Sequence, residues 1–200
     1  MTRPVRPLRA DAARNRELLL AAAEDEFVER GVSASVADIA RRAGVAKGTV
    51  FRHFATKEEL IAAIVGGHLA ALTAVARRLL DSADPGAALL EFLTVAADTR
   101  QQHDLTFLQT VSDGDSTVIE IRDQLYASIG ALVDRARAAG AIRPDITGMD
   151  VVLLVCAPVH VAGNLPDPAP DLWRRYLAII FDGLRPEGAS PLPRPAPSWP

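Results

Sequence analysis

The chain of 200 residues is 49% hydrophobic and 24% charged, with a formal net charge of −3, which is typical of a soluble globular protein. A single cysteine, Cys156, excludes an intramolecular disulfide and a cysteine-rich metal site. No uninterrupted apolar run reaches the roughly 18 residues of a membrane-spanning helix, and no apolar stretch follows the N-terminal arginines as it does in a secretory signal. We therefore expect a cytoplasmic protein with no membrane partner.

The charge is distributed unevenly along the chain. Residues 1–60 carry 11 Lys and Arg against 9 Asp and Glu, a net charge of +2. Residues 61–200 carry 11 against 16, a net charge of −5. This asymmetry predicts a polyanionic partner for the N-terminal part alone, beginning with a basic flexible arm over residues 1–10.

The N-terminal part predicts three helices in succession and then a long one. The first is amphipathic, ends at Gly31 and carries apolar residues at four-residue intervals, Leu19, Ala23 and Phe27. Ser35 can cap a second, short helix that ends at Gly44, and a third covers about residues 46–53. A capping box at Thr56 begins a fourth helix that reaches about residue 80.

Helical periodicity continues toward the C-terminus, and no alternating pattern typical of a strand occurs. Further helices are predicted over residues 85–102, 105–112, 116–139, 151–164 (capped by Thr147) and 171–184. From Pro186 onward, six prolines in fifteen residues predict a disordered tail over 186–200. The fold class is therefore all-α with about nine helices, divided into an N-terminal domain over residues 11–60 and a larger helical domain over 61–185.

No catalytic or metal-binding arrangement is evident in the sequence. The segment 47–49, Lys-Gly-Thr, has the residue types of a phosphate-binding loop, but their order and helical context differ from G-x-x-x-x-G-K-[ST]. The four histidines are too scattered to form an i,i+4 pair of metal ligands. Cys156 is best interpreted as a small buried apolar residue. We expect neither an enzyme nor a cofactor.

Residues 36–54 fit a helix-turn-helix instead. Ala40 is small enough for two helices to cross closely, Gly44 permits the turn, and apolar residues can fill the wedge between the helices, namely Ile39, Val45, Val50 and Phe54. The remaining polar residues of the third helix then face outward, with Gly48 allowing a close backbone approach: Lys47, Thr49, Arg52 and His53. Lys57 opposes the dipole of the fourth helix unless that end binds an anion, although a solvated surface lysine is an equal alternative.

Residues 16–60 resemble the DNA-binding domain of the tetracycline-repressor-like (TetR/AcrR) family of transcriptional regulators. The resemblance is carried by three segments, Leu19–Gly31, Ser35–Val45 and Ala46–Lys57. It implies contacts to DNA from Ser35, Lys47, Gly48, Thr49, Phe51, Arg52, His53 and Lys57. Two positions depart from the family pattern: Ala46 replaces a common capping Ser, and Phe51 replaces a usual Tyr. Phe51 therefore either contacts DNA or packs inside the domain.

The resemblance also implies a mode of action for the rest of the chain. It implies a homodimer that binds a pseudo-palindromic double-stranded operator as a repressor and is released by a small molecule. The final helix pair would form the dimer interface rather than only cap the monomer core, through Val152, Val155, Trp173, Leu177, Ile180, Phe181 and Leu184. A pocket for an unidentified, largely apolar effector would be lined by Phe92, His103, Phe107, Tyr126 and His160. The alternative is a helical binding or scaffold protein whose helix-turn-helix is structural only.

Overall fold

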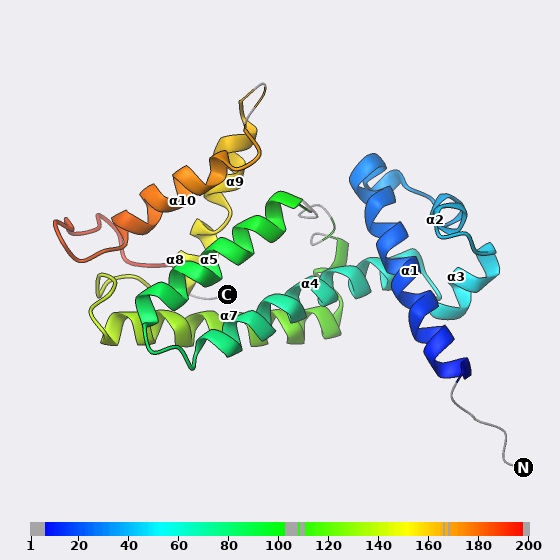
Figure 1. Ribbon diagram of the computed structural model, residues 1–200, viewed down its shortest axis with the longest axis horizontal. Helices are drawn as coiled ribbons and strands as arrows, with labels where there is room; N and C mark the ends of the chain where they lie inside the picture. The colour runs from blue at the N-terminus through cyan, green and yellow to red at the C-terminus, as the bar shows by residue number, and fades with distance from the viewer. Residues whose placement is uncertain (1–6, 103–107, 109–110, 166, 168, 198–200) are drawn as a thin grey trace, which may run out of the picture. The chain divides into compact units, whose positions relative to one another are not determined.

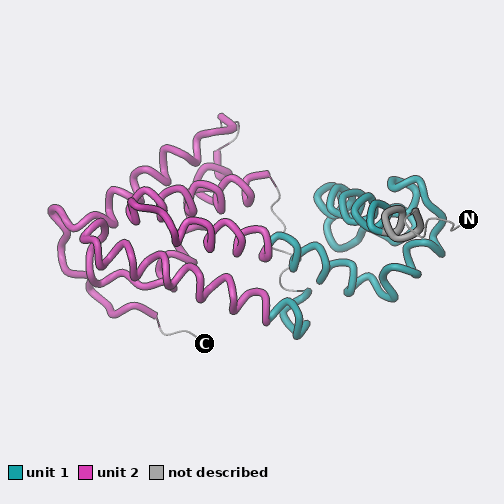
Figure 2. Tube along the Cα trace, turned by 60° about the horizontal axis from the view of Figure 1, so that its bottom comes forward, with its two compact units in different colours: residues 1–68, 104–119 teal, residues 69–103, 120–200 magenta. Residues whose placement is uncertain are grey.

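The computed structural model describes the chain except residues 1–6, 103–107, 109–110, 166, 168 and 198–200, and it describes side chains from residue 13 onward. The described residues form helices joined by turns, with no strand among them, as expected for an all-α fold (Figure 1). The chain divides into two compact units (Figure 2). Unit 1 comprises residues 1–68 and 104–119, and unit 2 comprises residues 69–103 and 120–200.

Unit 1 contains the predicted helix-turn-helix. Its helices are α1 (Pro7–Arg30), α2 (Val36–Arg42), α3 (Lys47–His53) and the first part of α4 (Lys57–Leu79), with a 3-10 turn, η1 (Gly31–Ser33), after α1. Because proline is favoured in the first turn of a helix, α1 begins at Pro7. Residues 7–10, which we expected in a flexible arm, are therefore helical.

A single apolar core holds these short helices together. Leu19, Ala23 and Phe27 of α1 are fully buried, as their four-residue spacing predicts. The other apolar residues of unit 1 that are at most 4% exposed include Ile39, Ala40, Val50, Phe54, Leu60, Ile61 and Ile64. Because α2 and α3 are only seven residues each, they depend on this packing rather than on their own helix propensity.

Unit 2 is built from longer helices. It contains the rest of α4, α5 (Pro85–Gln102) and most of α7 (Ser116–Ala138), followed by α8 (Gly148–Leu154), α9 (Ala157–Gly163) and α10 (Leu172–Gly183). The bounds of α5, α7 and α10 agree with the predicted helices within one residue. The helix predicted over 105–112 lies mostly outside the described residues.

The single helix that we predicted over residues 151–164 is wrong. Thr147 caps α8 as expected, since its side chain accepts a hydrogen bond from the Asp150 N–H and Asp150 bonds back in a full capping box. The helix nevertheless ends at Leu154, and α9 begins only at Ala157. Pro158 accounts for the break because it has no N–H for the Leu154 carbonyl and its ring clashes with that carbonyl.

The proline-rich tail that we predicted to be disordered makes a contact with the rest of the chain. Residues 186–197 form no helix, but the Arg143 Nη2 donates a hydrogen bond to the Ser190 carbonyl at 2.5 Å. Arg143 also binds the Asp145 carboxylate at 2.6 and 2.8 Å, which holds the pKa of Asp145 below its usual value, with a smaller contribution from the Leu192 backbone. The first part of the tail is thereby fastened to the loop between α7 and α8.

Helix α4 is long and apolar enough to cross a membrane by length and composition, which the inspection of apolar runs in the sequence missed. Half of its apolar window is buried inside the protein. Residues Leu60, Ile61 and Ile64 lie in the core of unit 1, and Ala76 and Leu79 in that of unit 2. A core helix of a soluble protein passes the same test of length and composition.

Candidate nucleic-acid interface

The turn between α2 and α3 is specified by local chemistry. The Ser35 hydroxyl accepts a hydrogen bond from the Asp38 N–H at 3.2 Å and so caps α2. Gly44 adopts φ of +68°, a left-handed conformation that other residues rarely adopt, and the Val45 N–H then donates to the Ala40 carbonyl at 3.0 Å. Ala46 occupies the N-cap of α3 without a side-chain hydrogen bond, as its replacement of Ser predicts.

Helix α3 buries one side and exposes the other. Val50 is 1% exposed and Phe54, its C-cap, is 4% exposed. Lys47, Gly48, Phe51 and Arg52 are exposed, whereas Thr49 and His53 are half-buried. The predicted division thus agrees with the burial of Val50 and Phe54 and the exposure of Lys47 and Arg52, whereas Thr49 and His53 are less exposed than expected.

Phe51 does not pack inside the domain. It is 45% exposed, and the Lys47 ammonium lies 5.8 Å from the centroid of its ring. At this distance the cation is attracted to the ring face, so the two side chains form one exposed pair on the outer surface of α3. Of the two alternatives that the sequence left open for Phe51, burial is thus excluded.

Gly48 has no internal reason to be glycine. A Cβ atom added there would meet nothing within 4 Å among the described residues, and its φ is not positive. Since glycine weakens a helix by roughly 0.5–1 kcal/mol relative to alanine, the fold would be served better by alanine.

Lys57 lies differently from our expectation. Its side chain is half-buried, and its ammonium donates a hydrogen bond to the Val32 carbonyl. It also lies 5.5 Å from the centroid of the Phe27 ring. Lys57 thus faces η1 and α1, where it fastens the start of α4, and the prediction that it faces the duplex is wrong. The carbonyl and the ring supply the negative electrostatic potential that a cation in the first turn of a helix lacks.

Ser35 is exposed but engaged. In addition to accepting the capping bond, its hydroxyl donates to Asp38 Oδ2 at 2.6 Å. Arg41 binds the other carboxylate oxygen of Asp38 at 2.6 Å. The Ser35 bond, followed by that of Arg41, lowers the pKa of Asp38 from 3.8 to about 2.

A polar network that the sequence analysis missed joins α2 to α1. Glu26 is only 2% exposed, and its Oε1 lies 2.9 Å from the Nε of Arg42. Arg42 also binds Glu29 at 2.6 Å, which lowers the pKa of Glu29 and raises that of Arg42. A further contact links the two helices, since Arg30 Nη1 lies 3.3 Å from Asp38 Oδ2. The acidic face of α1 and the basic end of α2 were visible in the sequence, but not their pairing.

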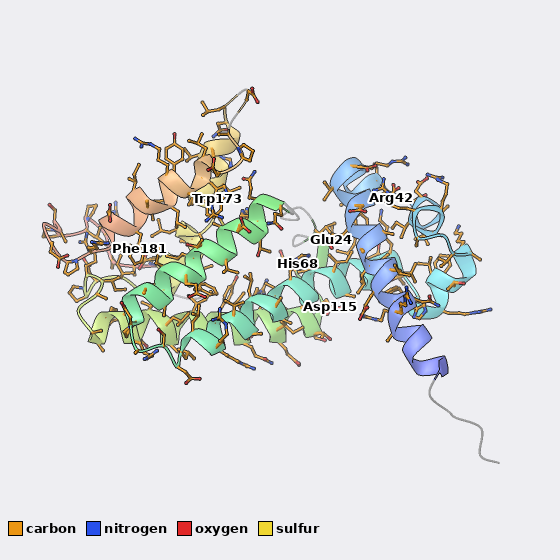
Figure 3. All side chains as sticks on the ribbon, in the orientation of Figure 1. Glu24, Arg42, His68, Asp115, Trp173 and Phe181 are labelled. Atoms are coloured by element: carbon orange, nitrogen blue, oxygen red, sulfur yellow. The ribbon has the colours of Figure 1, made fainter. Side chains whose placement is uncertain are left out.

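A second contact joins α1 to α4. The His68 Nε2 lies within hydrogen-bonding distance of Glu24 Oε1, and Figure 3 shows the two side chains approaching each other. With Lys57 at the start of α4 and His68 further along, α4 is attached to α1 at two points within unit 1.

The comparisons with known proteins agree with this geometry. Residues 19–64 match the family model of bacterial regulatory proteins of the tetR family, and residues 84–186 match the C-terminal domain of SbtR-like transcriptional regulators. The chain belongs to the TetR family of transcriptional regulators. It is therefore a DNA-binding regulator, and not an enzyme.

Relatives of known name or structure cover nearly the whole chain of this TetR-family regulator. The transcriptional repressor KstR2 of Mycobacterium tuberculosis is 29% identical over 185 residues, which make up 85% of this chain and 92% of KstR2. The crystal structure of a TetR protein from Mycobacterium vanbaalenii is 32% identical, covers 90% of this chain and 99% of its own, and has a TM-score of 0.65. A TetR regulator from Streptomyces coelicolor is 30% identical, with coverage of 86% and 99% and a TM-score of 0.62.

Three of the five predicted effector residues of this TetR-family regulator lie in the described part of the chain, and they differ in burial. Phe92 is 1% exposed in the core, Tyr126 is half-buried against that core, and His160 is exposed on α9. His103 and Phe107 lie outside the described residues. A hollow of about 250 Å³ does lie between α5 and α10, but it is lined by other residues, Leu90, Thr94, Arg174, Leu177, Ala178, Phe181, Asp182 and Arg185.

The predicted dimer residues fall into two groups. Trp173, Leu177, Phe181 and Leu184 are at most 6% exposed and pack into the core of the same protomer, so they are not available to a second copy. Val152, Val155 and Ile180 are half-buried. The sequence analysis missed the apolar residues in α8–α10 and the intervening loop that are 45–56% exposed, namely Leu153, Val161, Leu165 and Ile179.

The lowered pKa of Asp38 predicts a pH-dependent stability for the TetR-family DNA-binding unit. A carboxyl group with a lower pKa in the folded state stabilises the fold fully above its unfolded pKa of 3.8, and this stabilisation is lost as the pH falls toward 2. We expect wild type to be more stable than Asp38→Asn at pH 5, with the difference shrinking between pH 4 and 2. Urea midpoints across this range measure it, and a constant difference would contradict the assignment.

Proposed function

We propose that this regulator is a homodimeric repressor that acts in the cytoplasm, binds a pseudo-palindromic DNA operator and is released by a largely apolar small molecule. The observation that carries the DNA-binding mode is the exposed surface of α3, where Lys47, Gly48, Phe51 and Arg52 face outward while Val50 anchors the helix. The names of curated relatives, which are transcriptional repressors, support repression.

Helix α3 suits the major groove because its first turn combines small and cationic residues. In helix-turn-helix proteins, the N-terminal residues of the recognition helix contact base edges and their neighbours hold phosphates. Lys47, Gly48 and Thr49 occupy that first turn, whereas Arg52 and His53 lie at the other end of the helix. Thr49 offers a hydroxyl to a base or phosphate and a methyl group to thymine.

Phe51 and Ser35 contribute in different ways. The exposed Phe51 ring has no hydroxyl, so it contacts a thymine methyl group or a deoxyribose rather than donating to a phosphate. Its pairing with Lys47 restricts the lysine to one side of the helix. Ser35 approaches the backbone from the start of α2, with a hydroxyl that Asp38 already orients.

The dimer interface that we propose lies on α8, α9, α10 and the loop before α10, where Leu153, Val161, Leu165 and Ile179 are exposed and Val152, Val155 and Ile180 are half-buried. Large exposed apolar side chains commonly mark an interaction site when they adjoin one another. A second copy of the chain is the partner because two helix-turn-helix units related by a two-fold axis read a pseudo-palindrome.

The effector is proposed to be largely apolar because the helices of unit 2 bury few polar groups. Phe92 belongs to a core of aliphatic and aromatic residues, and Tyr126 packs against it. The buried polar side chains of unit 2 include Thr73 and Ser128, whose hydroxyls donate to backbone carbonyls of their own helices. A pocket opened among such residues would bind an apolar molecule with one or two polar anchors.

Selection from random DNA duplexes tests the proposed function directly. We expect enrichment of an inverted repeat whose half-sites lie about 10–10.5 bp apart or at a multiple of this spacing. The Thr49→Val variant should enrich a different base within each half-site while preserving the spacing. Recovery of duplexes with no common sequence would favour the scaffold alternative, in which the helix-turn-helix is structural only.

Gly48→Ala separates stability from binding. Because the added Cβ meets nothing within 4 Å in the described chain, the variant should unfold at a higher urea concentration, by about 0.5–1 kcal/mol. Its operator affinity should fall at least about tenfold, or about 1.4 kcal/mol, because the methyl group blocks backbone approach. Gly67→Ala in α4 is the matched control, since Gly67 is also exposed and unobstructed, and it should not change affinity.

Ile179→Glu tests the dimer interface. The side chain is 56% exposed, so the protomer should keep its stability, whereas a charge at the centre of an apolar interface should weaken self-association roughly tenfold or more. Sedimentation velocity at graded concentrations measures this. Leu192→Glu, at a tail residue that is 43% exposed, is the control and should leave the dimer intact. If Ile179→Glu and Leu192→Glu self-associate equally strongly, the dimer interface does not include Ile179.

A further inference from the structure

Arg16, in the middle of α1, lies against the end of the recognition helix. Its guanidinium carbon is 5.2 Å from the centroid of the Phe54 ring. Phe54 is 4% exposed and ends α3, where its N–H donates to the Val50 carbonyl at 2.9 Å. The guanidinium therefore covers a ring that belongs to the buried core, at a point directly after Arg52 and His53.

The N–H groups of Arg16 are free to bind a ligand, in contrast to those of three other arginines of unit 1. Arg30, Arg41 and Arg42 are each bound to carboxylates of α1 or α2. Arg16 is exposed, and no hydrogen bond or ion pair joins it to another described residue of the chain. A guanidinium that stacks its face on an aromatic ring keeps its five N–H groups directed outward in the ring plane, which is the geometry that grips a phosphate with two parallel bonds.

We propose that Arg16 is a phosphate clamp, which binds one backbone phosphate of the operator beside the end of α3. The cation–π attraction to the Phe54 ring holds the guanidinium near the end of α3 before DNA arrives, so less side-chain freedom is lost on binding. Because Phe54 is also the C-cap of α3, the clamp ties the phosphate to the recognition helix itself and sets how the helix enters the groove. Arg16 precedes the residues that the TetR family model matches, which begin at residue 19.

This inference rests on the proposed docking of α3 into the major groove, and it makes a distinct prediction. A phosphate contact carries no sequence information, so its loss weakens binding to every duplex by a similar factor. Each lost contact also makes the plot of log affinity against log salt shallower by about 0.9. A residue that only covers the Phe54 ring would change stability instead and leave the salt dependence as it is.

The experiment measures affinity for the selected operator from about 50 to 200 mM salt, together with thermal stability. Arg16→Gln should bind roughly tenfold more weakly, with a slope shallower by about 0.9 for each half-site. Arg16→Lys should keep the wild-type slope of log affinity against log salt, because the charge remains. Its affinity should lie between those of wild type and Arg16→Gln, because lysine cannot donate the two parallel hydrogen bonds of a guanidinium. Arg194→Gln, in the exposed tail, makes the same change in net charge and should alter neither quantity.

Arg16→Met resolves the remaining ambiguity because it keeps apolar cover over Phe54 without the charge. If this variant is as stable as wild type and still binds weakly with the shallower slope, the clamp is supported. If Arg16→Gln or Arg16→Met keeps the wild-type slope and affinity, the clamp is overturned. Lys47→Gln distinguishes failure of the proposed DNA-binding function from failure of the Arg16 clamp. If Lys47→Gln binds the operator more weakly and the Arg16 variants do not, the proposed function is retained and only the clamp is rejected. If wild type selects no duplex at all, both are rejected.

Discussion

A buried carboxylate on α1 determines where the recognition helix can lie. Glu26 is 2% exposed, and a charge so far from water destabilises the fold unless an opposite charge meets it. Arg42, at the end of α2, meets it at 2.9 Å and holds Glu29 at the same time. Since α2 is fixed on α1 in this way, the left-handed Gly44 sets the direction in which α3 leaves. The orientation of the proposed DNA-binding surface thus depends on a polar network between α1 and α2, outside α3 itself.

Two cations on two aromatic rings illustrate how position decides the role of a residue. Lys57 lies over Phe27 and Arg16 over Phe54, at similar distances of 5.5 and 5.2 Å. The lysine ammonium is also bound by the Val32 carbonyl, so its charge serves the attachment of α4 to α1. The planar guanidinium uses only its face on the ring, and its edge stays available to solvent. The sequence predicted a DNA contact for Lys57 and named none for Arg16, whereas the contacts in the structure separate the two cations the other way.

The elements that could be predicted from the sequence are those specified by neighbouring residues. Caps at Ser35 and Thr147 and the turn at Gly44 act within a few residues, so the helix bounds and the helix-turn-helix agreed with the structure. The errors arose at residues whose side chains contact residues far away in the sequence. Lys57 finds a carbonyl 25 positions earlier in the chain, and the Glu26–Arg42 pair likewise joins separate helices. The break before Pro158 is an exception, since the proline was visible and its effect on the Leu154 carbonyl was underestimated.

The last helix shows why an apolar face does not reveal its partner. Trp173, Leu177 and Phe181 recur every four residues and are buried in their own protomer, while Ile179, on the other side of the helix, is 56% exposed. Periodicity identifies the first face as apolar, but a face that packs in the core and a face that packs on a second copy have the same composition. Because α10 presents both, the interactions that fold the protomer are distinct from those proposed to pair two protomers. Self-association can then change, by substitution or by a bound ligand, without unfolding the helix that provides it.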